Sequence, residues 1–113
     1  MNLTPFFSDA LTHPVESWGP LPEATGEPME TSGFTLWEEG DQMVGIWCCT
    51  TGHSRWDFKT HEMIVVVAGK MTCTVDGGEA VELKTGDTAF FPKGWSGTWE
   101  IIEDIRKLFT IFD

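Results

Sequence analysis

No lysine or arginine precedes Arg55, so the first 54 residues contain neither of these basic side chains. The formal net charge of the 113 residues is −11. Proteins that bind nucleic acids need a cationic face that displaces counterions from the phosphates, and anionic membrane surfaces attract cationic segments for a related reason. The lack of positive charge therefore argues against nucleic acid and against membrane surfaces as partners.

Cysteine is scarce, and long apolar runs are absent. Cys48 and Cys49 are adjacent and Cys73 makes the count odd, which disfavours a framework of disulfides. No apolar stretch approaches the roughly 20 residues that span a bilayer. The amino-terminal residues do not show the basic start and apolar run of a secretory signal. These absences lead us to expect a protein of the reducing cytoplasm.

Tyrosine is missing, but six tryptophans and eight phenylalanines give the short chain a heavy aromatic load. Hydrophobic residues make up 41% of the sequence, which is enough for a core. Aromatic rings in this number fill a wide interior or cover a partner surface. The length leaves room for one domain.

Five of the six prolines fall within residues 1–30, where little periodicity is visible. We interpret this segment as an irregular N-terminal arm and residues 31–113 as the folded domain. In the domain, short runs of β-branched and aromatic residues alternate with turn signals, which is typical of an all-β sandwich or barrel. The runs predict strands at 32–39, 43–50, 54–58, 62–69, 70–75, 80–84, 88–92, 97–102 and 106–112.

One predicted strand, EMIVVVAG at 62–69, is apolar on both of its faces. Alternate side chains of a strand face opposite sides, so an inward Glu62 places Ile64 and Val66 inward as well. Met63 and Val65 then face outward. We expect this strand to be covered on both faces, either by a second layer or by another subunit, and we therefore expect a homodimer.

Two stretches resemble the signature motifs of the cupins, which are small jelly-roll β-barrels. The stretches are GHSRWDFKTHEMIVVVAG at 52–69 and GDTAFFPKGWSGTW at 86–99. The positions that match the two motifs are Gly52, Glu62, Gly69, Gly86, Pro92 and Gly94. RWDF, FFPKGWSGTWEI and the closing IRKLFTIF look closer to small cupins related to the cupin domain of (S)-ureidoglycine aminohydrolase. The resemblance covers roughly residues 30–113 and implies a cupin-type (RmlC-like) jelly-roll barrel.

The resemblance also implies a metal site of three histidines and one glutamate, of which this chain keeps only the glutamate. The histidine positions fall on Arg55, Asp57 and Gly97, and the glutamate position falls on Glu62. A transition metal needs about four good donors, and a guanidinium repels a divalent ion. We therefore expect no cofactor, with Arg55 paired to Glu62 or Asp57. A divalent metal held by Asp57, His61 and Glu62 is the alternative, reached through a one-residue bulge that turns His61 inward.

We expect a ligand pocket at the barrel mouth. Trp95 and Trp99 share the parity of Gly97, which leaves space beside them, so their rings either wall the pocket or fill the core. Trp56 and Phe58 are expected to face outward. Lys107, in the last strand, is expected to reach a pocket rim or a carboxylate. The predicted pocket residues are Arg55, Asp57, Glu62, Trp95, Trp99 and Lys107, and no residue is assigned a catalytic role.

Three functions fit these residues. The first is binding of a compact polar metabolite, anionic or amide-bearing, gripped by the guanidinium and carboxylates and stacked on Trp99. The second is an enzyme that releases ammonia from a ureido compound, by analogy with ureidoglycine aminohydrolase, using a metal or a Glu62/His61 acid–base pair. The third is a structural dimer without a ligand, held by the arm and by strand addition. We favour the first.

Overall fold

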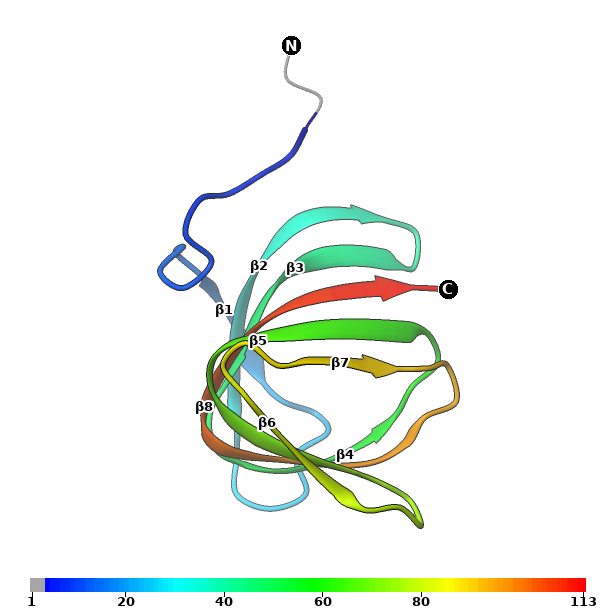
Figure 1. Ribbon diagram of the computed structural model, residues 1–113. Helices are drawn as coiled ribbons and strands as arrows, with labels where there is room; N and C mark the ends of the chain where they lie inside the picture. Colours follow the sequence, from blue (N-terminus) through cyan, green and yellow to red (C-terminus); the bar gives the residue numbers. More distant parts are fainter. Residues whose placement is uncertain (1–3) are drawn as a thin grey trace.

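The computed structural model describes residues 4–113, which form eight β-strands and no helix (Figure 1). None of these residues belongs to a helix with the length and apolar character that crossing a bilayer requires. The strands are β1 Glu16–Pro20, β2 Glu30–Glu39, β3 Gln42–Cys49, β4 Gly52–Asp57, β5 His61–Val75, β6 Ala80–Lys84, β7 Thr88–Phe91 and β8 Ser96–Phe112.

The long strands β5 and β8 pair with each other and curve through the whole barrel (Figure 1). The first half of β5 pairs with β7, and its second half pairs with β6. The first half of β8 pairs with β4, and its second half pairs with β3. All pairings are antiparallel, and β2 and β1 extend the sheet beyond β3. This two-layered arrangement confirms the predicted all-β jelly-roll barrel.

Each long strand was predicted as two separate strands, and that division is wrong. Residues 62–69 and 70–75 both lie in β5, and residues 97–102 and 106–112 both lie in β8. Gly69 has φ +89°, and a Cβ there would collide with the Asp104 carbonyl. The register of β5 against β8 shifts around this glycine. Bulges bend a strand without ending it, so the glycine is a corner of the barrel and not a break.

The predicted arm contains a regular strand. Within residues 1–30, β1 pairs with β2, from Glu16 opposite Gly33 to Pro20 opposite Glu30. Residues 1–3 of the arm lie outside the described residues. The segment before β1 contacts the outside of the barrel, where the rings of Phe7 and His13 lie 6.1 Å and 4.3 Å from the ring of Phe34. Arg106 donates hydrogen bonds to the carbonyls of Ala10 and His13 in this segment.

The core lies between the two layers and is built by the alternation predicted for 62–69. Glu62, Ile64 and Val66 are buried, whereas Met63 is 41% exposed. The outward side of β5 is therefore apolar and only partly covered within one chain. The buried apolar side chains that complete the core include Met29, Ile46, Met71, Trp99, Ile101, Ile105 and Phe109.

Candidate functional site

Strand β4 presents to the barrel the side chains that were predicted to face outward. Ser54 is buried and Trp56 is half-buried, whereas Arg55 is exposed. The Trp56 indole N–H donates to Ser54 Oγ at 2.8 Å, and the Trp56 ring lies 4.5 Å from the Trp99 ring. The prediction that Arg55 points into the barrel and Trp56 away from it is wrong. A one-residue change of parity reverses every side chain of a strand, and this strand carries large side chains on both faces.

Arg55 makes its ion pairs on the outside of the barrel. Its Nη1 donates to Asp76 Oδ1 at 2.6 Å, its Nη2 donates to Asp76 Oδ2, and Asp57 Oδ1 lies 3.7 Å from Nη2. The hydrogen bonds between the two side chains raise the pKa of Arg55 and lower the pKa of Asp76. Asp57 accepts a hydrogen bond from Ser96 Oγ at 2.6 Å. The predicted Arg55–Glu62 pair does not form, and neither Arg55 nor Asp57 lines the pocket described below.

His61 does not join the two carboxylates in a metal-ligand set. Its Nδ1 accepts a hydrogen bond from the backbone N–H of Lys93 at 2.9 Å, and its ring stacks on Phe90 at 5.6 Å. Within the part of the chain that the structure describes, no three His, Cys, Asp or Glu side chains are placed to hold an ion. The alternative ligand set of Asp57, His61 and Glu62 is therefore not assembled, and the residues present do not fit a transition metal.

Inside the barrel, the partner of Glu62 is Lys107. Lys107 Nζ lies 2.7 Å from Glu62 Oε2, and the two side chains are 3% and 8% exposed. The ammonium also lies 4.6 Å from the centre of the Trp47 ring and 4.4 Å from that of Trp99, which are cation–π distances. A positive side chain thus stands beside the one retained ligand position of the motif, as expected, but it is Lys107 and not Arg55.

A pocket of about 210 Å³ opens beside this ion pair. Its walls come from β1, β3, β4, β5 and β8 and are mostly aromatic or aliphatic. The lining residues are Trp18, Met43, Trp47, Trp56, Glu62, Lys107, Phe109 and Ile111. An apolar pocket with a few polar groups that orient the ligand is the usual form of a small-molecule site. Sequence reasoning missed the wall residues, although the alternation in MVGIWCCT gave a signal that Trp47 faces one side with Gly45 and Cys49.

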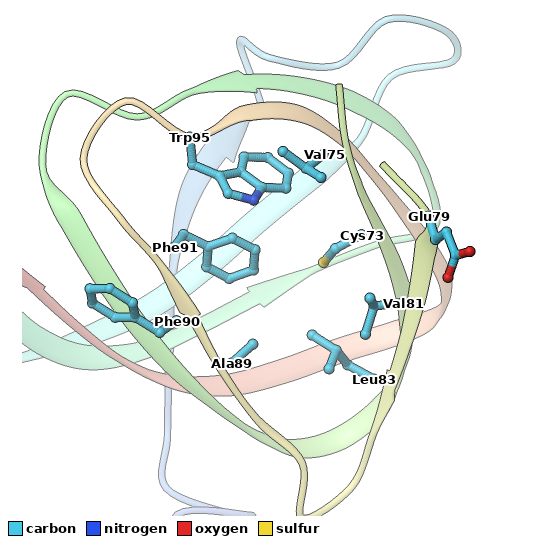
Figure 2. Close-up of a pocket in the computed structure, with 9 residues that line it drawn as sticks. All are labelled: Cys73, Val75, Glu79, Val81, Leu83, Ala89, Phe90, Phe91 and Trp95. Atoms are coloured by element: carbon cyan, nitrogen blue, oxygen red, sulfur yellow. The ribbon is translucent and has the colours of Figure 1, made fainter. Parts of the chain in front are cut away.

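A second pocket of about 150 Å³ lies between β6 and β7 (Figure 2). Trp95 lines this pocket and Trp99 lies in the core, so the prediction that both rings wall one pocket is wrong. Gly97 leaves no free space, because a Cβ there would lie 2.6 Å from the Trp95 ring. Glu79, the charged residue of the lining, points away from the others in Figure 2, so no charged group of the lining is placed to orient a ligand. The lining residues are Cys73, Val75, Glu79, Val81, Leu83, Ala89, Phe90, Phe91 and Trp95.

The two buried thiols, Cys49 and Cys73, are poor nucleophiles. Burial raises the pKa of Cys73 to about 12 and the pKa of Cys49 to about 11. The thiolate is the reactive form, so both side chains are core residues and not candidates for catalysis. The candidate site is therefore the pocket beside Glu62 and Lys107, which alone among the pockets described here combines aromatic walls with a buried pair of charges.

Comparisons with known proteins agree with this architecture. A family model described as an EutQ-like cupin domain matches residues 36–109. No curated protein matches the chain. Among solved structures, a DUF861-family protein of unknown function from Pseudomonas syringae superposes with a TM-score of 0.81 at 20% identity, over 91% of this chain and 46% of that protein. The chain thus spans about half the length of that relative.

Two further structures are similar over shorter spans. A putative ethanolamine utilization protein Q from Salmonella typhimurium has a TM-score of 0.68 at 21% identity, over 83% of this chain and 76% of that one. A DUF861-family protein from Thermotoga maritima has a TM-score of 0.57 at 30% identity, over 59% of this chain and 76% of that one. At these identities and spans the likeness supports the barrel fold.

Proposed function

The chain belongs to the family of EutQ-like cupin domains, and from this premise we propose that it binds a small polar metabolite in the pocket beside Glu62 and Lys107. The observation that carries the proposal is the buried ion pair at the pocket wall. Taking two charges out of water costs several kcal/mol for each ion, and well-packed apolar residues of similar volume are often at least as stabilising. A buried pair that faces a pocket is therefore better explained by recognition than by stability.

The pocket divides binding between its charged and its aromatic groups. Lys107 supplies hydrogen-bond donors and Glu62 supplies acceptors, while the rings of Trp47 and Trp56 offer flat surfaces for stacking. The ammonium occupies the place beside Glu62 that a metal would need. We therefore propose that binding proceeds without a metal cofactor.

Calorimetry with a small library of sugars, amino acids, amides and ureido acids tests this function, with Lys107→Met as the site variant and Arg55→Ala as the matched control. We expect at least one compound to bind the wild type and the Arg55 variant equally and to lose affinity for the Lys107 variant. Binding that is unchanged in the Lys107 variant would place the ligand elsewhere and contradict the proposal.

An aminohydrolase of the ureidoglycine type is a second candidate. The feature that favours it is the carboxylate and ammonium 2.7 Å apart at the pocket wall, since such a pair can accept and donate protons. The expected signature is ammonia released from a ureido acid by the wild type and not by Glu62→Gln. His61, the predicted partner in acid–base chemistry, points to the Lys93 loop and has no place in this mechanism.

We also propose that the chain forms a homodimer through the outer face of β5. The dimer would either accompany ligand binding or be the function by itself, as in a structural dimer without a ligand. Met63 is 41% exposed and Phe90 is 52% exposed on this face. Met63 also lines an apolar hollow of about 210 Å³, together with Leu36, Val65 and Leu108. Contiguous apolar surface of this kind marks contact with another protein.

A further inference from the structure

We infer that the pocket selects a neutral planar group that both accepts and donates hydrogen bonds, such as a primary amide on an aromatic ring, over anions and cations of the same shape. This inference rests on the proposed binding function and names its ligand class. Three properties of the site support it: its charge, its free hydrogen-bonding positions and the shape of its walls.

The charge of the site is close to zero, because Glu62 and Lys107 neutralise each other at 2.7 Å. A ligand carboxylate that approaches the ammonium also approaches the Glu62 carboxylate, and a ligand amine that approaches Glu62 also approaches the ammonium. Attraction and repulsion then nearly cancel. The ionised ligand still loses its hydration in an aromatic pocket, and nothing in the site repays that loss.

Both members of the pair keep hydrogen-bonding positions that a neutral ligand can use. An ammonium has three N–H donors, of which one is directed to Glu62. An ionised carboxylate has about four acceptor positions, and within residues 4–113 its hydrogen-bond partner is Lys107. An amide can place its carbonyl oxygen on Lys107 Nζ and its N–H on the Glu62 carboxylate at the same time.

The walls favour a flat apolar body behind that amide. The centres of the Trp47 and Trp56 rings lie 6.3 Å apart, and the ring planes make an angle of 79°. A ligand ring that stacks parallel to one of them is therefore nearly perpendicular to the other and contacts it edge to face. The Trp56 indole N–H is already bonded to Ser54 and adds no further donor. Trp18 lines the outer part of the pocket, with its ring packed against Gly33, where a Cβ would displace it.

Three probes of nearly equal shape separate the alternatives at pH 7: benzamide is neutral, benzoate is an anion and benzylamine is a cation. We expect benzamide to bind the wild-type chain at least about tenfold more tightly than either charged probe, as measured by calorimetry, with shifts in NMR signals of the tryptophan indoles of the pocket. Tightest binding of benzoate or of benzylamine in this pocket would overturn the inference and leave the proposed function intact. Binding of all three weaker than about 10 mM would also overturn the inference, whereas the proposed function is decided by the library of sugars, amino acids, amides and ureido acids.

Two variants test whether the ion pair sets the preference. Glu62→Gln leaves the lysine charge uncompensated, so the ratio of benzoate to benzamide affinity should rise by about tenfold. Trp18→Ala keeps the pair and needs no change in the core; it should weaken all three probes and leave their order unchanged. An unchanged ratio in a folded Glu62→Gln variant, or a changed order in Trp18→Ala, would contradict the inference.

Discussion

Glu62 and Lys107 are separated by 45 residues in the sequence, and their charged atoms meet at 2.7 Å inside the barrel. The contact exists because β5 and β8 pair along their length and turn both side chains to the interior. Trp47 and Trp99 lie against the Lys107 ammonium and reduce its contact with water. Each charge of the pair is therefore stabilised mainly by the other. Several expected properties of the protein follow from this pair and from its surroundings.

Removal of one member of the pair should be costly. Lys107→Met leaves the Glu62 carboxylate buried without its partner, and we expect the free energy of unfolding to fall by about 3–5 kcal/mol. The double variant Glu62→Met/Lys107→Met removes both charges and should recover most of that loss. Urea unfolding followed by circular dichroism measures both values. A single variant that loses less than about 1 kcal/mol would show that the pair is not desolvated as described.

Arg55→Ala should leave the stability almost unchanged, since the Arg55–Asp76 pair is exposed to solvent. The lowered pKa of Asp76 means that the small contribution of this pair is present above the pKa that Asp76 has when unfolded. It is lost as the pH falls through the folded value. The melting temperature of the variant, measured from pH 7 to pH 3, checks this. A loss of stability as large as that of Lys107→Met would indicate that Arg55 lies in the barrel interior.

Gly69→Ala should destabilise the barrel at its corner. The residue has φ +89°, and the new Cβ would meet the Asp104 carbonyl on the facing strand. Strain and collision together should cost about 2 kcal/mol or more. Gly26→Ala is the matched control, because its Cβ would meet no atom within 4 Å. Equal stability of the two variants in urea would argue against a strained corner at Gly69.

The buried thiols should make the protein lose stability at alkaline pH. Burial raises the pKa of Cys73 from 9.0 to about 12, so above pH 9 the unfolded chain releases this proton and the folded chain keeps it. The stabilisation is complete below the unfolded pKa and declines as the pH rises toward the folded pKa. Cys73→Ala should flatten the slope by about 1.4 kcal/mol for each pH unit in this window.

The control for this slope is Met71→Ala, which also truncates a fully buried side chain but removes no titrating group. Its stability should be lower than that of the wild type by a similar amount at every pH from 8 to about 11. Urea unfolding across this pH range distinguishes the loss of a titrating thiol from the loss of packing alone. A slope in Cys73→Ala as steep as in the wild type would mean that the thiol is accessible to water in the folded state.

The proposed dimer should dissociate when its apolar face receives charge. Met63→Glu places a carboxylate on the outer face of β5, where two copies would bring like charges together. Val81→Glu is the control, because Val81 is also exposed but lies on β6, in the other layer. Sedimentation equilibrium should show a dimer for the wild type and the control and a monomer for Met63→Glu. A monomeric wild type would contradict the proposed dimer.

The sequence by itself determined that this is an all-β barrel with Glu62 inside it. Turn signals and alternating apolar positions are local. The run EMIVVVAG is apolar on both faces, so alternation only groups Glu62 with Ile64 and Val66, and the cupin motif indicated that this group faces inward. The motif glycines and proline carried the resemblance to cupins, and Lys107 was expected to reach a pocket rim or a carboxylate from the last strand. The strand IRKLFTIF did not indicate which carboxylate it would meet.

Only the tertiary structure decided which charge meets Glu62 and which rings line the pocket. Strand β4 has large side chains on both faces, so its sequence is compatible with either orientation. Packing chose the one that buries Trp56 and exposes Arg55, because covering a ring costs nothing and covering an unpaired guanidinium costs several kcal/mol. Two further features depend on contacts between residues far apart in the chain, which no local pattern contains. They are the continuity of β5 and β8 and the position of Trp18, a residue of the arm, in the pocket wall.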